Sequence, residues 1–244
     1  MANGSEHDGG TRKVKVWDGA TRLFHWALVL LVLLSYLTGE VGGFDFTMPG
    51  SGAMVANMTV HMWSGLLILA LVLFRIVWGF VGSTSARFSD FVRGPGAVIA
   101  YVSGVAKRSA KFVAGHNPAG GLMVVIMLVL LLGQAIGGLF AKEDDFFGIA
   151  GPLNSFVSEE TAKTITGLHK QNWEIIEILV LVHIAANILY WIVLKQNLIV
   201  AMITGAKDAP AGAAVPALKF ASPLMAAVVM AAALGVVLYV RSLG

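Results

Sequence analysis

Five long apolar runs, separated by polar segments, dominate the sequence. They cover residues 23–38, 58–80, 122–140, 174–194 and 223–240. A helix needs about 20 apolar residues to cross the hydrocarbon core of a bilayer, and each run is close to that length. The pattern therefore predicts an all-α integral membrane protein with five transmembrane helices and with its two termini on opposite sides of the membrane.

Polar residues at the edges of these runs predict where helices begin. Asp18 or Thr21 is positioned to cap the first helix, and Asn117 followed by Pro118 is a typical start for the third. Between the second and third runs, residues 86–116 mix aromatic side chains with lysine and arginine. That mixture favours a segment that lies along the membrane interface.

The chain divides into four parts by its composition. Residues 1–16 form a polar tail, 17–205 a membrane domain, 206–219 a linker rich in alanine, proline and glycine, and 220–244 a C-terminal transmembrane helix. A linker of this composition is flexible. We therefore expect the fifth helix to be loosely attached to a core of four helices.

The overall composition supports the membrane interpretation and excludes several classes of site. The 244 residues are 57% hydrophobic and 13% charged, far more apolar than a soluble domain. The net charge of +3 does not predict a nucleic-acid partner, because the basic residues lie in short segments beside apolar runs, as in a protein that contacts membrane lipid. The absence of cysteine excludes disulfides, iron–sulfur clusters, thiol nucleophiles and covalently attached haem.

The distribution of charge predicts the orientation in the membrane. Lysine and arginine concentrate in the alternate segments 12–22, 87–111 and 195–219, whereas the opposite segments carry more acids than cations. The positive-inside rule then places the N-terminus in the cytoplasm and the C-terminus on the far side. The first 22 residues hold no apolar core with a cleavage site, so the first run is expected to remain as an anchor.

Four histidines fall within or beside the apolar runs, where ionisable residues are costly and indicate function. With the orientation above, His25 and His183 lie toward the cytoplasmic side, and His61 and His169 lie toward the outer side. Fourteen residues separate His169 from His183, which is close to four helical turns and about 21 Å along the axis. The two rings thus share a helix face but cannot share one metal, so the depths pair His25 with His183 and His61 with His169.

Two facing imidazoles suit a haem iron, since the porphyrin supplies its other four ligands. Zinc needs about four protein ligands at one place, and neither pair has a cysteine or a carboxylate beside it in the membrane. A histidine-containing membrane transporter without haem is the alternative, although it gives no natural account of two separated pairs.

Two further residues are candidates for cofactor binding. Arg75 follows His61 by fourteen residues, so it lies on the same helix face at the inner level, where a haem propionate would need a cation. A cation that extends from the helix end to the interface is an equally good explanation. His116 lies at the cytoplasmic interface, where it is a candidate for quinone binding, propionate contact or support of the helix cap.

Five motifs stand out along the chain: "VWDGATRLFHW", "HMWSG", "GHNPAGG", "EDDFFGIAGPL" and "GLHKQNWEIIEILVLVHIAANILY". Together they resemble the bacterial cytochrome b561 family, and especially its branch related to the b-type cytochrome subunits of nickel–iron hydrogenases. The resemblance implies a bundle of four core helices that holds two b-type haems, with His25, His61, His169 and His183 as axial ligands. The fifth helix is an addition to the minimal four-helix pattern.

The resemblance also implies electron transfer across the bacterial inner membrane, between the quinone pool and a redox partner at the periplasmic face. The outer segment 141–171, acidic in its first half, is the candidate docking surface for a cytochrome or an oxidoreductase. Members of the family that oxidise superoxide and reduce quinone suggest an enzyme as the alternative, with Lys163 and Lys170 as candidates to attract the anion.

Overall fold

The protein is an all-α membrane bundle. The computed structural model describes residues 11–43, 45–52, 54–110, 112–142 and 148–244. Within them, five helices are long and apolar enough to cross a membrane, as the sequence predicts. They are α1 (Gly19–Tyr36, continued by the π-type turn η1, Leu37–Val41), α2 (Asn57–Val81), α5 (Pro118–Phe140), α6 (Glu159–Leu194) and α8 (Pro223–Ser242).

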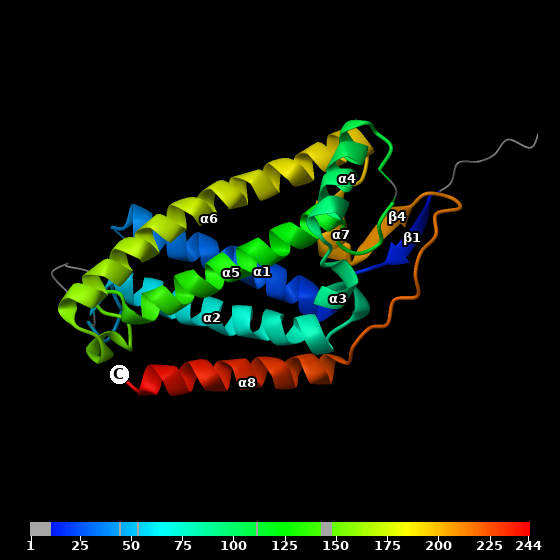
Figure 1. Cartoon of the computed structure of the whole chain (residues 1–244). Helices are drawn as coiled ribbons and strands as arrows, with labels where there is room; N and C mark the ends of the chain where they lie inside the picture. The colour runs from blue at the N-terminus through cyan, green and yellow to red at the C-terminus, as the bar shows by residue number, and fades with distance from the viewer. Residues whose placement is uncertain (1–10, 44, 53, 111, 143–147) are drawn as a thin grey trace, which may run out of the picture.

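Helix α2 forms the centre of the bundle, in contact with α1, α5 and α8, while α6 packs along α5. Figure 1 shows the five helices side by side, with α6 and α8 on opposite sides of the other three. The largest buried cluster joins Phe24 of α1, Val72 and Trp78 of α2, Leu128 of α5 and Ile176 of α6. Burying these side chains away from lipid holds the helices at fixed rotations, which sets the directions of the polar side chains between them.

Helix α6 is much longer than its apolar run. It begins at Glu159, where the Ser158 hydroxyl accepts a hydrogen bond from the Thr161 N–H at 3.2 Å and the acidic residues Glu159 and Glu160 occupy the first turn. Its 36 residues span about 54 Å. The last part of the expected outer segment 141–171 is therefore helical, from Glu159 onward. Hydrophobicity marks the part of a helix that lies in lipid, so it did not reveal where this helix begins.

The prediction of a loosely attached fifth helix is wrong. Helix α8 packs along α2 and buries Ala226, Ala233 and Val237. Ala226 and Ala233 are seven residues apart, so they lie on one helix face, and their small side chains let the two helices approach closely. The segment before α8 is also held, because the Ser83 hydroxyl accepts from the Ala221 N–H at 2.9 Å.

The first residues of the expected linker form a strand. Strand β4 (Ala206–Ala209) pairs antiparallel with β1 (Arg12–Lys15), so the two segments predicted as a polar tail and a flexible linker bind one another. Gly205 separates β4 from the short helix α7 (Leu198–Thr204) with a φ of +86°, a conformation that favours glycine. Its carbonyl accepts from the N–H groups of Val16 and Trp17 at 2.8 and 3.0 Å.

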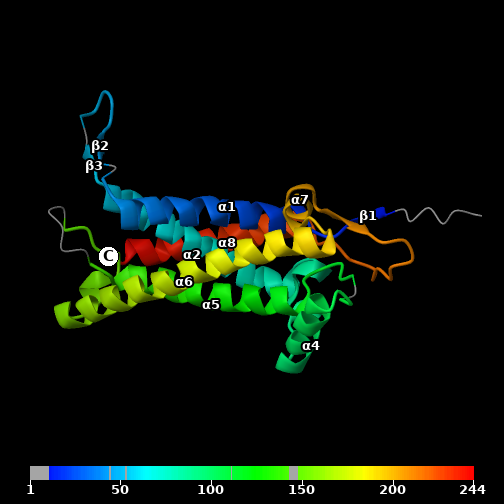
Figure 2. The ribbon, with the colours of Figure 1, turned by 90° about the horizontal axis from the view of Figure 1, so that it is seen from above.

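The remaining short elements lie at the two ends of the bundle. They are β2 (Phe46–Thr47), β3 (Met54–Val55), η2 (Thr84–Ala86), α3 (Phe88–Phe91), α4 (Pro95–Ala106) and η3 (Asn154–Phe156). Figure 2 shows α4 projecting sideways from one end of the bundle and the β2–β3 hairpin from the other. Helix α4 would span only about 18 Å, too short to cross the bilayer, which agrees with the interfacial segment predicted from the sequence.

Candidate functional site

Three helices bring four histidines together as two pairs. The ring centres of His61 on α2 and His169 on α6 are 6.2 Å apart, and those of His25 on α1 and His183 on α6 are 6.4 Å apart. Helix α6 contributes one ring to each pair, with about 21 Å along its axis between them. The bundle therefore contains two separate places where imidazoles face each other across a gap.

The width of each gap fits a metal ion bonded to both rings. A metal–nitrogen bond of about 2 Å on each side would place the two ring centres roughly 6 Å apart. Neutral imidazole is the form that binds metal, and the ligating nitrogen must carry a lone pair. The hydrogen bonds of the other ring nitrogens decide whether these histidines meet that requirement.

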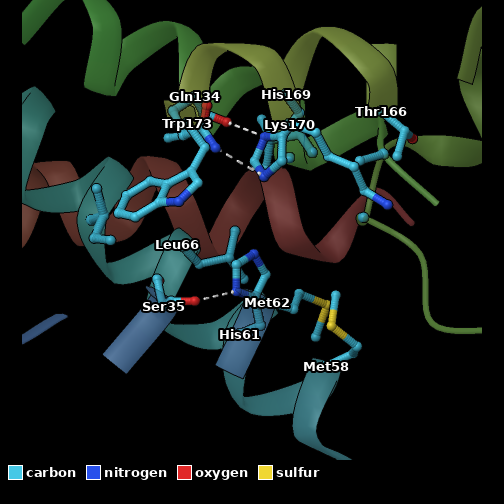
Figure 3. Close-up of a pocket in the computed structure, with 18 of the residues that line it drawn as sticks. Ser35, Met58, His61, Met62, Leu66, Gln134, Thr166, His169, Lys170 and Trp173 are labelled. Carbon is cyan, nitrogen blue, oxygen red and sulfur yellow. Dashed lines mark hydrogen bonds between the residues drawn. The ribbon is translucent and has the colours of Figure 1, made fainter. Parts of the chain in front are cut away.

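We name the pairs after the sides of the membrane expected from the loop charges, so that His61 and His169 are the outer pair and His25 and His183 the inner pair. At the outer pair, backbone carbonyls fix the ring tautomers (Figure 3). His61 Nδ1 is 3.0 Å from the Ser35 carbonyl oxygen, and His169 Nδ1 is 3.0 Å from the Gln134 carbonyl oxygen. A carbonyl only accepts, so each Nδ1 carries the proton and each neutral ring presents its lone pair on Nε2. Metal-ligating histidines are oriented by bonds of this kind in most known sites.

The Gln134 side chain adds a second contact to His169. Its Nε2 lies 3.2 Å from His169 Nε2, and its Oε1 accepts from Asn172 Nδ2 at 2.7 Å. Asn172 Nδ2 also donates to the Leu130 carbonyl at 3.0 Å, so this end of the Asn172 amide is the NH2 group. The orientation of both amides follows from this network, and Gln134 directs an NH2 group at the Nε2 lone pair.

The inner pair has a similar arrangement on one helix. Asn187 Nδ2 donates to the His183 carbonyl at 2.7 Å and lies 3.3 Å from His183 Nε2. The contact with the carbonyl identifies this atom as the donor end of the amide, so His183 Nε2 also carries a lone pair. The buried Nδ1 of His25 has no hydrogen-bond partner among the residues that the structure describes.

Gly39 allows the close approach of His61 to α1. A Cβ at this position would lie 2.6 Å from His61 Cε1 and 2.7 Å from Nδ1, far inside van der Waals contact. Gly39 lies in the π-type turn η1, which follows Ser35, and π-type turns are frequent at functional sites. The turn and its glycine together place the Ser35 carbonyl and the His61 ring in contact.

The outer pair lines a pocket whose other lining residues are mostly apolar and include a few charged side chains. Leu66, Leu131 and Trp173 line it together with the two rings, and Glu40, Lys142 and Lys170 are also among its lining residues. Sequence reasoning found neither Gly39 nor the amides of Gln134, Asn172 and Asn187. Polar side chains within apolar runs were the signal that could have identified the amides.

Arg75 is the second candidate feature, near the C-terminal end of α2. Its side chain is 2% exposed, and neither Nη1 nor Nη2 has a hydrogen-bond partner within the described residues. The guanidinium group lies 5.3 Å from the Phe88 ring centre and 5.8 Å from that of Phe91. The Asp18 carboxylate attracts this cation electrostatically but accepts no hydrogen bond from Nη1 or Nη2. Buried donors without acceptors are costly, so this environment favours a further anionic group such as a carboxylate.

His116 lies beside this cation. Its ring is 4.5 Å from that of Phe91 and 4.6 Å from that of Trp17, and its buried Nδ1 has no hydrogen-bond partner in the part of the chain described. Lys207 of β4 donates to the carbonyls of Val113 and Gly115, and so holds the loop that precedes His116. Burial and the nearby charges of Arg75 and Lys207 lower the pKa of His116 to about 3.

This pKa predicts that acid destabilises the protein. The unfolded chain has a His116 pKa of about 6.5, so between about pH 6.5 and 3 it binds more protons than the folded chain, and stability falls as the pH falls. At pH 5 the loss from this residue is about 2 kcal/mol. We expect the decrease in Tm between pH 7 and pH 5, measured in detergent, to be smaller for His116→Gln; an equal decrease would contradict this assignment.

Comparisons of the sequence with a family model and with individual proteins agree with one another. The family model described as "Prokaryotic cytochrome b561" matches residues 16–205. The chain is 25% identical over 214 residues to a probable Ni/Fe-hydrogenase B-type cytochrome subunit of Rhizobium leguminosarum bv. viciae, covering 80% of this chain and 88% of that protein. It is 26% identical over 215 residues to the protein of the same description from Azotobacter vinelandii, covering 79% and 87%. No solved structure matches the chain.

Proposed function

Because the chain belongs to the prokaryotic cytochrome b561 family, a family of b-type membrane cytochromes that bind haem and transfer electrons, we propose that it is a diheme cytochrome of the bacterial inner membrane. In this proposal it transfers electrons between the quinone pool and a redox partner on the periplasmic side. His61 and His169 hold the outer haem, and His25 and His183 hold the inner one.

One observation supports this proposal above all. The two histidine rings of each pair face each other, and the two pairs lie at different levels of the bundle. Each pair has the ring separation that an iron between them requires, and three of the four rings present Nε2 as a lone pair. When bound, haem supplies a reversible one-electron change at its iron. The residues of the chain hold the rings neutral and oriented, and the apolar helices around them exclude water from the two sites.

Arg75 and His116 contribute to the inner haem site in this proposal. Both have buried nitrogen atoms without a hydrogen-bond partner among the described residues, and both contact the Phe91 ring. Donors of this kind suit the propionate of a haem bound by His25 and His183. A buried cation beside the inner site disfavours the oxidised, more positive form of the haem, and so raises its reduction potential.

Replacing Arg75 is expected to lower the potential of the inner haem alone. Arg75→Gln removes the charge and keeps a shorter polar side chain, and a decrease of roughly several tens of millivolts is expected in a spectroelectrochemical titration. Arg75→Lys is the matched control, because it keeps the charge, and its potential should lie closer to that of the wild type. An unchanged reduction potential of the inner haem in Arg75→Gln would contradict the assignment of Arg75 to the inner haem site.

The partner is proposed to dock at the end of the bundle where the outer pair lies. Of the candidate segment 141–171, Glu143, Asp144 and Asp145 lie outside the described residues. The described part presents an exposed Phe156 followed by Glu159 and Glu160 at the start of α6. His169 follows Glu159 by ten residues, or about 15 Å of helix, so this surface is close to the proposed outer haem.

Haem content and reduction by quinol test the function directly. We expect protein purified in detergent to contain two haem b groups per chain, each with the low-spin spectrum of two histidine ligands, and to be reduced by a quinol. Rapid mixing with superoxide tests the enzyme alternative, since reduction near the diffusion limit would favour it. Colourless protein with no band after addition of dithionite would contradict the proposal and favour a transporter.

A further inference from the structure

Two side-chain amides contact the histidine ring nitrogens that would bind iron in the proposed haem sites. Gln134 Nε2 is 3.2 Å from His169 Nε2, and Asn187 Nδ2 is 3.3 Å from His183 Nε2. Both contacts involve the histidines of α6, one in each pair. The amides come from different places, since Gln134 lies on α5 and Asn187 lies on α6, one turn after its histidine.

Hydrogen-bond partners leave little choice about the direction of these contacts. The backbone carbonyl oxygen of Gln134 can only accept, so His169 Nδ1 must carry the proton. The neutral ring then accepts a hydrogen bond at Nε2. The NH2 group of Asn187 donates to a carbonyl at 2.7 Å and faces His183 Nε2 with the same donor end. In both cases an N–H group and an iron would compete for one lone pair.

We infer that the amides of Gln134 and Asn187 donate to the ligating lone pairs of His169 and His183, so that haem would have to displace both amides to bind these rings. This inference rests on the haem sites of the proposed function. Each amide keeps its histidine in the tautomer that can bind iron, and each would have to leave that nitrogen for the histidine to serve as a ligand. The two residues therefore oppose haem loading at their own sites while they preserve the form of the ring that receives it.

The two amides differ in how firmly they are held. Gln134 is braced by Asn172, which donates to its Oε1 at 2.7 Å and to the Leu130 carbonyl at 3.0 Å. Asn187 keeps its bond to the His183 carbonyl whether or not it contacts Nε2. Displacing Gln134 disturbs a braced network, whereas Asn187 needs only to shift from one of its two acceptors. Haem is therefore expected to load more slowly at the outer site.

Haem titration of the apoprotein tests the inference one site at a time. In a His183→Ala background only the outer site keeps both ligands, and in a His169→Ala background only the inner site does. Gln134→Met removes the NH2 group and keeps the length of the side chain, and Asn187→Leu does the same for Asn187. Gln171→Met is the matched control, because Gln171 is exposed on α6.

One lost hydrogen bond corresponds to about a fivefold change in an equilibrium constant. We expect Gln134→Met to bind haem about fivefold more tightly at the outer site only, Asn187→Leu to do so at the inner site only, and Gln171→Met to match its background. Circular dichroism of each apoprotein verifies that it is folded. Unchanged or weaker binding by folded Gln134→Met and Asn187→Leu would overturn the inference.

A measurement on the unmutated apoprotein avoids any effect of substitution on folding. Nitrogen-15 NMR of labelled histidine is expected to show unprotonated Nε2 in His169 and His183 before haem is added; protonated Nε2 would overturn the inference. Failure of the unmutated chain to form any spectrum of two histidine ligands would instead contradict the proposed function. The two failures are thus distinguishable.

Discussion

Replacing His183 by alanine is expected to reduce the haem content from two groups per chain to one. The remaining haem should keep the low-spin spectrum of the outer site, because His169 lies about 21 Å from His183 along α6, and both His169 and His61 of α2 keep their carbonyl partners. Pyridine haemochrome analysis gives the haem content, and low-temperature spectra or electron paramagnetic resonance separate the two sites.

Ile184→Ala is the control for this experiment. Ile184 is adjacent to His183 and 48% exposed, so its substitution alters the same turn of α6 without touching the pair. This variant should retain both haems. Loss of the outer spectrum alone in His183→Ala would refute the pairing of His183 with His25, and loss of both haems would show that the sites do not load independently.

Introducing a methyl group at Gly39 is expected to weaken binding of the outer haem and to leave the inner one unchanged. The added Cβ of Gly39→Ala would lie 2.6 Å from His61 Cε1, so the ring must move and lose its 3.0 Å bond to the Ser35 carbonyl. Loss of the bond that orients a ligating histidine typically costs 10–100-fold in metal affinity, about the range expected here for the outer haem. Haem titration of the apoprotein measures this loss.

Gly235→Ala is the control for Gly39→Ala. Gly235 is exposed on α8 and is not among the residues that line this pocket, and a Cβ there meets no atom within 4 Å. Both substitutions replace glycine by alanine, and only the Gly39 variant crowds His61. A Gly39→Ala protein that binds the outer haem like Gly235→Ala would contradict the role of this glycine.

The depths of the histidines followed from local features of the sequence. Loop charges predicted the direction of each helix in the membrane. The fourteen-residue spacing predicted that His169 and His183 lie on the same face of one helix. The structure brings each of them next to the histidine expected at its own depth. Arg75 is buried near the C-terminal end of α2, fourteen residues after His61. Residues that act through their depth and helix face can be found in this way, because helix pitch and apolar length are properties of the local sequence.

Contacts that hold the histidines could not be found in this way. The Ser35 carbonyl reaches His61 through the turn η1, and Gln134 reaches His169 from a helix 35 residues away in the chain. Backbone carbonyls leave no mark in a sequence, and neither does the space that Gly39 leaves for an imidazole. These features depend on how α1, α2, α5 and α6 are rotated against one another.

The sequence by itself determined the five long apolar helices, the spacing of the candidate ligands along them and the family of the protein. Apolar length, helical periodicity and loop charge are enough for these, since each acts within one segment. Only the tertiary structure decided that α8 packs on α2, that β1 and β4 bind each other, and that amides and carbonyls direct the histidine tautomers. Those outcomes depend on contacts between segments that are distant in the sequence. The free energies of such contacts cannot be read from either segment alone.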